Sequence, residues 1–204
     1  MKTLKEFILE AKAPIFTNDI EGIQAFCEYV FDSELYDWVV NPDKTISIET
    51  KNPRNINIYM NTQDLKEVPD FIVFADMPKY DLFLHYNSKI ERWAPKVNGI
   101  VRGIGMSDNK KTKVIDLSDC EMKGGRLFIQ KSFIERIENA KGEDIQIFIR
   151  NNRKLNNIDI SGIKSVKDNA SWMTNNRALD PSQFKLPKGI RIEKNKENEK
   201  IYIS

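Results

Sequence analysis

The chain contains one histidine, His85, and two cysteines, Cys27 and Cys120. A zinc site built from these residues would need them to converge without the short ligand spacing typical of zinc-binding motifs. A Ser–His–Asp constellation with His85 as its base is open in principle, but no GxSxG nucleophile motif accompanies it. His85 directly follows an alternating apolar segment, which favours a structural position near the end of a strand. We therefore predict no metal, no cofactor, no catalytic residue and no enzyme.

The segment NGIVRGIGMSDN, residues 98–109, is rich in glycine and contains Arg102. Backbone N–H groups of such a stretch can bind phosphate. However, the spacing of Gly99, Gly103 and Gly105 matches neither the dinucleotide-binding fingerprint nor the P-loop. Turns and strand bulges are the favoured explanation for these glycines.

Two basic clusters could contact a phosphate backbone. The favoured alternative is a solvated edge that keeps a sheet from pairing with itself, because several aspartates lie nearby in the sequence. The candidates are Lys110, Lys111 and Lys113 in the first cluster, and Arg150, Arg153 and Lys154 in the second.

Two tryptophans in segments that we predict to be loops are candidates for contacting a partner. Trp, Arg and Met are the residue types enriched at the energetic centres of protein interfaces. The alternative is burial of each ring beneath its loop. The candidates are Arg92 and Trp93 in the first segment, and Trp172 and Met173 in the second.

Two amphipathic helices are predicted at the N-terminal end. Apolar residues recur at helical spacing from Leu4 to Ala11, and Pro14 ends this first helix. A second apolar face runs from Ile20 to Phe31, directly after three residues that can cap a helix N-terminus. These cap candidates are Thr17, Asn18 and Asp19.

From residue 44 onward, short segments alternate apolar and polar residues, a pattern that predicts short strands. Four successive segments begin at residues 114, 127, 145 and 158, and two connecting stretches, 131–140 and 165–175, are predicted to be helical. This compact spacing predicts a solenoid whose stacked turns each add a strand to a parallel sheet. A mixed antiparallel sheet with two packed helices is the alternative.

The asparagine pairs at 151–152 and 156–157 suit tight corners, because Asn tolerates left-handed backbone geometry. The last two apolar segments, 190–192 and 201–203, predict a hairpin that protects the open end of the sheet. The predicted fold class is thus α/β, with N-terminal helices, an irregular solenoid of short strands and a C-terminal hairpin. The expected divisions are an amphipathic leader at 1–13, a helical cap at 14–43 and the solenoid at 44–204.

The charge balance is nearly even, with 32 basic and 30 acidic residues among 204 and a formal net charge of +2. A dedicated nucleic-acid-binding domain is expected to be clearly basic, so any charged surface must be local. No apolar run approaches the length of about 20 residues that a membrane span requires. Two distant cysteines do not form a disulfide framework. We therefore predict a soluble, cytosolic chain with buried, reduced thiols.

The opening residues MKTLKEFILEA resemble the capsid-targeting leader of the internal head proteins of T-even-like bacteriophages. In that family, the leader is a short amphipathic helix that takes the protein into the prohead. A phage protease then cuts after the Glu of a Leu/Ile-x-Glu pattern. The segment from Ile8 to Glu10 fits this pattern, so the resemblance implies processing between Glu10 and Ala11.

A second resemblance concerns the segment LKEVPDFI, residues 65–72, and the short strands after it, which look like degenerate leucine-rich-repeat-like proteins of the same phages. This resemblance implies a leucine-rich-repeat-like solenoid behind a small helical region. Together, the two resemblances imply a phage accessory protein that is packaged inside the virion and delivered to the host cytoplasm with the genome.

The expected function is non-enzymatic binding and inhibition of a host protein, plausibly a defence factor. The leader would contact the phage head or its prohead protease, and no membrane partner is expected. One alternative is a structural or DNA-associated head component that uses the two basic clusters. The other is an enzyme that modifies a host target.

Overall fold

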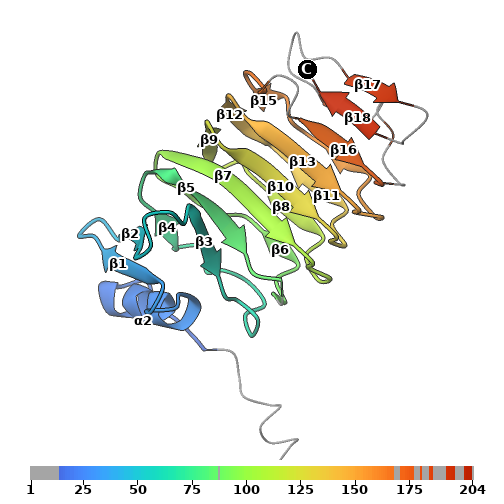
Figure 1. Ribbon diagram of the computed structural model, residues 1–204. Coiled ribbons are helices and arrows are strands. Elements are labelled where there is room, and N and C mark those ends of the chain that lie inside the picture. The colour runs from blue at the N-terminus through green and yellow to red at the C-terminus, as the bar shows by residue number, and fades with distance from the viewer. Residues whose placement is uncertain are drawn as a thin grey trace, which may run out of the picture.

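A computed structural model describes residues 14–86, 88–167, 171–176, 180, 184–185, 192–195 and 200–203. Its body is a parallel β-solenoid of about five turns, preceded by one helix (Figure 1). The solenoid prediction is confirmed, whereas the α/β class holds only in part because helices are few. The predicted leader, with Glu10 and Ala11, lies outside the described residues.

The chain enters through helix α2 (Ile20–Val30), and three sheets follow it in the described part of the chain. A small sheet at the N-terminal end has the order β1 (Tyr36–Val40), β2 (Thr45–Thr50) and β4 (Val73–Phe74). The main wall of the solenoid stacks β3 (Asn57–Met60), β5 (Met77–Leu84), β7 (Ile100–Ser107), β10 (Arg126–Gln130), β13 (Gln146–Arg150) and β16 (Trp172–Thr174).

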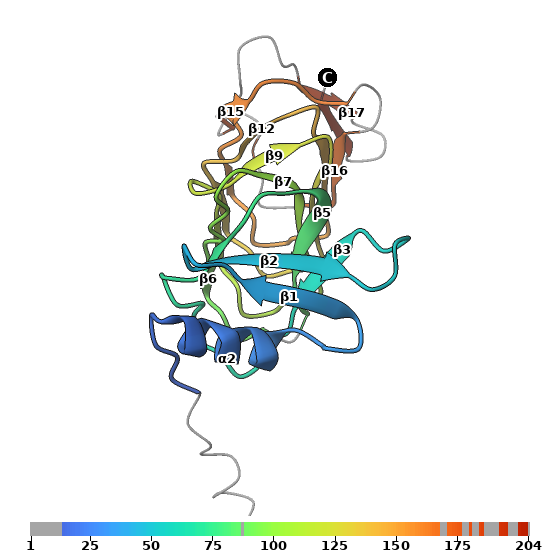
Figure 2. The ribbon, with the colours of Figure 1, turned by 90° about the vertical axis from the view of Figure 1, so that its left-hand side faces the viewer.

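Two further walls close each turn. The second wall stacks β6 (Arg92–Trp93), β8 (Val114–Asp116), β11 (Arg136–Glu138) and β14 (Asn157–Ile158). The third wall continues from the first residues of β7 through β9 (Glu121–Lys123), β12 (Lys141–Glu143) and β15 (Gly162–Ile163). Seen from the N-terminal end, the turns superimpose around one interior (Figure 2).

Inward-facing side chains form apolar rows across the turns. On the main wall, Leu82, Ile104, Leu127 and Ile147 align in register and are all fully buried. Opposite them, on the second wall, a row of buried side chains begins with Trp93 and continues through Ile115, Ile137 and Ile158. Because each turn buries its apolar side chains only against its neighbours, the core is continuous along the axis.

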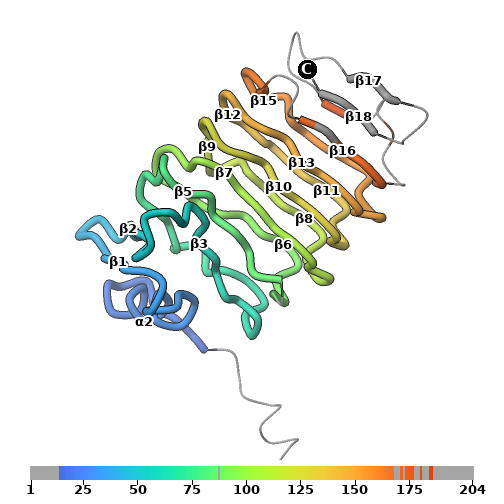
Figure 3. Tube along the Cα trace, viewed as in Figure 1, coloured from blue at the N-terminus to red at the C-terminus, as the bar shows by residue number. Residues whose placement is uncertain are grey.

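The period of the solenoid differs from the predicted one. Residues aligned on the main wall lie 20 to 24 positions apart, as the pairs Leu127 with Ile147 and Ile58 with Leu82 show. Figure 3 shows how the successive turns of the chain stack on one another. The predicted steps of 13 residues connect strands in different walls, whereas the predicted step of 18 residues connects β10 and β13 on the main wall, where paired residues lie 20 positions apart. The segment at 114 belongs to the second wall, whereas the segment at 127 belongs to the main wall.

Both connecting helices were wrongly predicted for the residues that the structure describes. The stretch 131–140 holds a turn and strand β11, and the described part of 165–175 holds strand β16. The helical spacing in the first stretch arises because Ile134, before β11, and Ile137, within it, both point into the interior, while Phe133 points to solvent. Three apolar residues so arranged mimic one helical face.

The N-terminal cap covers the first turn of the solenoid. Asp19 caps α2 as predicted, since its carboxylate accepts a hydrogen bond from the Gly22 N–H at 2.7 Å. Within the predicted helical cap at 14–43, however, β1 is a strand. The Tyr36 hydroxyl accepts from the Tyr59 N–H at 3.1 Å and donates to the Asn57 carbonyl at 3.4 Å, so it satisfies part of the open edge of β3.

The predicted hairpin at the other end is confirmed. Strands β17 (Ile192–Asn195) and β18 (Lys200–Ile203) pair antiparallel, and β18 pairs antiparallel with β16. The hairpin therefore continues the main wall beyond the last parallel strand. Its antiparallel pairing ends the stacking of parallel turns.

One corner of the solenoid carries a column of buried polar side chains, which we call the polar column. Its members, all buried except the half-buried Asn176, hydrogen-bond to one another or to backbone groups of their own and neighbouring turns. The Asn152 amide accepts from the Ser132 N–H at 2.9 Å and donates to the Ile129 carbonyl at 3.1 Å. The Asn109 amide likewise accepts from the N–H groups of its own turn. The column consists of Thr62, Ser88, Asn109, Ser132, Asn152 and Asn176.

The residue directly after each of β7, β10, β13 and β16 has left-handed backbone geometry, with φ between 48° and 59° for Asp108, Lys131, Asn151 and Asn175. Three of these four residues are Asp or Asn, which tolerate this conformation. The prediction that Asn151 occupies such a corner is confirmed. The turn at this position directs the next residues into the polar column.

Both cysteines are buried and unpaired, as predicted. Burial raises the pKa of each thiol, Cys27 in α2 and Cys120 before β9, to about 12. They lie in different parts of the fold. In the described residues, no group of three or more His, Cys, Asp and Glu side chains is placed to hold a metal ion.

Replacement of Asn152 by alanine tests the polar column. The variant N152A leaves the buried Ser132 N–H without its partner, so we expect the free energy of unfolding to fall by about 2 to 4 kcal/mol. Chemical denaturation measures this loss. The exposed neighbour Asn156 is the control, and N156A should change stability by less than about 0.5 kcal/mol. Equal effects of the two substitutions would contradict the role of the column.

Candidate functional site

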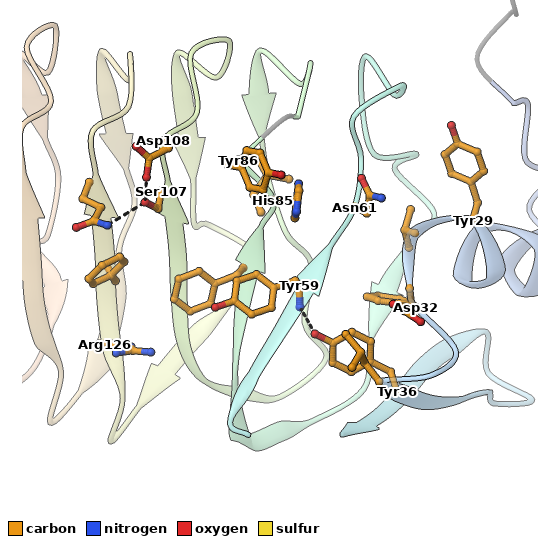
Figure 4. Close-up of a pocket in the computed structure, with 17 residues that line it drawn as sticks. Tyr29, Asp32, Tyr36, Tyr59, Asn61, His85, Tyr86, Ser107, Asp108 and Arg126 are labelled. Atoms are coloured by element: carbon orange, nitrogen blue, oxygen red, sulfur yellow. Dashed lines mark hydrogen bonds between the residues drawn. The ribbon is translucent and has the colours of Figure 1, made fainter. Parts of the chain in front are cut away.

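A groove of about 1060 Å³ lies on the outer face of the main wall, where this wall meets the N-terminal cap (Figure 4). We call it the wall groove. Its lining comes from α2, β1, β3, β5, β7 and β10 and from the residues that follow them, so it joins segments that are far apart in sequence. The lining includes Tyr29, Asp32, Leu35, Tyr36, Tyr59, Asn61, Phe83, His85, Tyr86, Ser107, Asp108, Arg126, Phe128 and Gln130.

Four of the lining side chains are large, apolar and exposed. Their exposed fractions are 38% for Tyr29, 51% for Leu35, 41% for Tyr59 and 54% for Tyr86. Isolated apolar residues on a surface need no explanation, but a group gathered around one hollow indicates a binding surface. The Tyr86 ring lies against the His85 ring, with 4.0 Å between the ring centroids.

An aromatic row forms the floor of the groove. The ring centroids of Tyr59 and Phe83 lie 5.3 Å apart, and those of Phe83 and Phe128 lie 6.0 Å apart. Gly105 lies between Phe83 and Phe128 in register and makes this contact possible, because a Cβ at Gly105 would lie 2.2 Å from the Phe83 ring. The predicted role of this glycine, in a turn or a strand bulge, is wrong, because Gly105 lies in regular register within β7 and leaves room for the Phe83 ring.

A buried carboxylate organises the charged end of the groove. Asp81 has no exposed surface and accepts from Arg102 and from Arg126, each at 2.9 Å. Arg126 also donates to the Asn57 side chain, and its guanidinium lies over the Phe83 ring at 5.6 Å from the centroid. Burial raises the pKa of the Asp81 carboxyl, and the two guanidinium groups oppose this shift. The single negative charge of Asp81 thus offsets half of the combined positive charge of Arg102 and Arg126.

A serine, a histidine and an aspartate share the groove without forming a catalytic triad. The Ser107 hydroxyl donates directly to the Asp108 carboxylate and accepts from the Gln130 amide. The His85 Nδ1 atom is buried and has no hydrogen-bond partner in the described part of the chain. A triad requires a hydrogen bond between the nucleophile and its base, which this geometry lacks. Burial lowers the pKa of His85.

The predicted partner-binding residues do not converge. Trp93 lies in strand β6 and is 1% exposed, so its predicted position in a loop is wrong; its ring fills the interior of the second wall. Met173 is fully buried in strand β16, and the backbone of Trp172 lies in the same strand. Arg92 is exposed on the second wall, where Asp116 and Glu138 both form ion pairs with it.

The structure brings together only part of the predicted basic clusters. Lys113 is paired with Glu91 at 2.8 Å, and Arg150 donates to the Gln130 side chain on the main wall. The remaining cations lie on exposed turns that stack along one edge of the solenoid, together with Lys131, which the sequence analysis did not single out. We call this edge the basic corner, and it comprises Lys110, Lys111, Lys131, Arg153 and Lys154.

Comparison of the chain with protein-family models, curated proteins and solved structures gives no match. Within the described residues, no helix is long and apolar enough to cross a membrane. The wall groove combines exposed aromatic side chains with converging polar groups.

Sequence reasoning missed the wall groove because its residues share no motif and come from six separate elements. Alternating strand patterns around Tyr59 and Phe83 could have indicated their outward direction. The register that aligns them with Phe128 depends on turn lengths, which vary from one turn to the next. Arg126 was likewise missed, since its carboxylate partner lies 45 residues earlier.

Replacing Asp81 by asparagine tests the electrostatic centre of the groove. The variant D81N leaves Arg102 and Arg126 without a carboxylate, so we expect the free energy of unfolding to fall by about 2 to 4 kcal/mol. Because both guanidinium groups are partly exposed, water can solvate them in the variant, and this limits the loss in the free energy of unfolding to the stated range. The exposed pair of Glu143 and Lys123 is the control, and E143Q should cost less than about 1 kcal/mol. Urea denaturation of both variants measures these changes in the free energy of unfolding. An unchanged denaturation midpoint for D81N would contradict this account.

Proposed function

We propose that the protein is a non-enzymatic binding module that binds a host protein through the wall groove. The observation that carries this proposal is the convergence of four exposed apolar side chains on one hollow. Aromatic residues supply large contact areas with few rotatable bonds, and they are enriched at the centres of protein interfaces. Tyr29 lies on helix α2 and Tyr59 on strand β3, so regular elements hold two of the four side chains in place before a partner arrives.

The charges around the groove define the chemistry of the partner. Asp32 and Asp108 are exposed at its rim, whereas the guanidinium of Arg126 is held by its ion pair with the buried Asp81. An acidic rim around an apolar floor favours a partner segment with an apolar side chain flanked by Lys or Arg. The partner in this proposal is therefore a folded protein that presents such a segment.

The biological setting rests on the resemblance of residues 1–11 to phage capsid-targeting leaders. In this proposal, the protein is a phage accessory protein that is packaged in the head, processed between Glu10 and Ala11 and released into the host. There it inhibits a defence factor by occupying its surface. The resemblance of residues 65–72 to leucine-rich-repeat-like phage proteins supports the same setting.

A pair of groove substitutions tests the binding surface. The double variant L35S/Y86S removes two exposed apolar side chains from the wall groove, so we expect about ten-fold less partner to be retained than with the unchanged protein. The measurement is affinity capture from a lysate of the host, quantified by mass spectrometry. Circular dichroism confirms that the variant is folded.

The matched control is the double variant I15S/V39S, which removes apolar side chains exposed elsewhere, with 91% and 61% exposure. It should retain the same partner as the unchanged protein. If the groove variant and the control retain equal amounts, the partner binds elsewhere and the wall groove is not the site.

Packaging has a separate test. Mass spectrometry of purified virions of the source phage should find this protein, with a peptide that begins at Ala11. Detection of only the uncut N-terminus, or absence from the virion, would contradict the packaged and processed state while leaving the binding test in place.

A further inference from the structure

The basic corner is formed by the turns that follow β7, β10 and β13. These turns stack directly on one another, since the Phe133 N–H donates to the Asn109 carbonyl at 2.9 Å and the Lys131 N–H donates to the Arg150 carbonyl at 3.0 Å. Successive turns are therefore about one strand spacing apart, roughly 4.8 Å. Lys111 and Arg153, two turns apart, lie on one continuous edge.

The positive charge of this corner is largely unbalanced. Within the described part of the chain, Lys110, Lys111 and Arg153 form no ion pair, and the Lys131 Nζ lies 4.0 Å from the Asp108 carboxylate, at the outer limit of such a contact. For a protein with a net charge of only +2, this is a marked local concentration. Cations without acidic partners are the expected feature of a surface that binds a polyanion.

An exposed aromatic ring lies among these cations. Phe133 is 43% exposed, and the Lys154 ammonium lies 5.2 Å from its ring centroid. The ring borders a hollow of about 470 Å³, together with Lys131 and Arg153 on neighbouring turns. The surface therefore offers both cations and an aromatic face to the same ligand.

We infer that the basic corner binds single-stranded nucleic acid, with phosphates at Lys110, Lys111, Lys131 and Arg153 and a base stacked on Phe133. A single strand matches both features, because it combines a charged backbone with unpaired bases that can stack on an aromatic ring. In a duplex, the bases are stacked on one another and unavailable to Phe133. This inference does not rest on the wall groove, whose partner is a protein.

Fluorescence anisotropy with a labelled oligothymidylate of about 10 nucleotides tests the inference on the full chain. Three to four phosphate contacts predict that the logarithm of the binding constant falls with the logarithm of the salt concentration, with a slope of about −2 to −3. The double variant K110A/K111A should reduce the magnitude of this slope by about 1.4. The matched control K123A/K164A removes the same charge from the third wall and should leave the slope unchanged.

The aromatic contact has its own readout. The variant F133L keeps an apolar side chain but removes the ring, so affinity should fall about five-fold or more while the salt slope stays the same. The inference is overturned if no binding occurs at low salt, if F133L binds like the unchanged protein, or if K123A/K164A weakens binding as much as K110A/K111A. Stronger binding to a duplex of the same length, or to anionic lipid vesicles, would also overturn it and assign the corner to that ligand.

Discussion

The interaction on which the rest of the structure depends is the hydrogen bonding of buried polar side chains across neighbouring turns. Turn lengths vary between 20 and 24 residues, and no apolar repeat fixes how one turn sits on the next. Asn109 and Asn152 supply the missing specification, because each amide satisfies backbone groups that would otherwise be buried without partners. These buried backbone groups keep their hydrogen-bond partners in only one alignment of the turns, and any other alignment would leave them unpaired at a cost in free energy. The polar column thus sets the alignment of the turns.

This alignment produces both surfaces. On the main wall it places Asp81 opposite Arg126, two turns away, and it brings Phe83 and Phe128 together over Gly105. At the corner it stacks turns that carry unpaired cations. A shift by one residue in any turn would reverse the direction of the side chains on that strand. The wall groove and the basic corner are therefore consequences of one register.

Much of the fold could be predicted from the sequence. Alternating strands, the Asp19 cap and the C-terminal hairpin follow from local rules that the structure obeys. The number of walls could not be predicted, because strands in different walls have the same alternating pattern. Trp93 was placed in a loop for a similar reason, since a strand of two residues leaves almost no pattern. What fixes its burial is the row of isoleucines that it joins on the second wall.

The candidate sites depend even more on long-range register than the fold does. Local clustering pointed to basic residues at 110–113 and 150–154, but only the stacking of turns shows that Lys113 and Arg150 are engaged elsewhere. The wall groove has no local signature, because each of its elements contributes only a few residues. Side chains that act together across turns become visible only when the turns are aligned.

The central claim is that the polar column locks the turns into a preformed surface, and native-state hydrogen exchange by NMR tests it most directly. The N–H groups of Thr112 and Ser132, which donate to column amides, should exchange only through global unfolding. Their free energies of opening should then equal the free energy of unfolding of the whole protein. Exchange of these N–H groups as fast as that of exposed turn residues would contradict the claim.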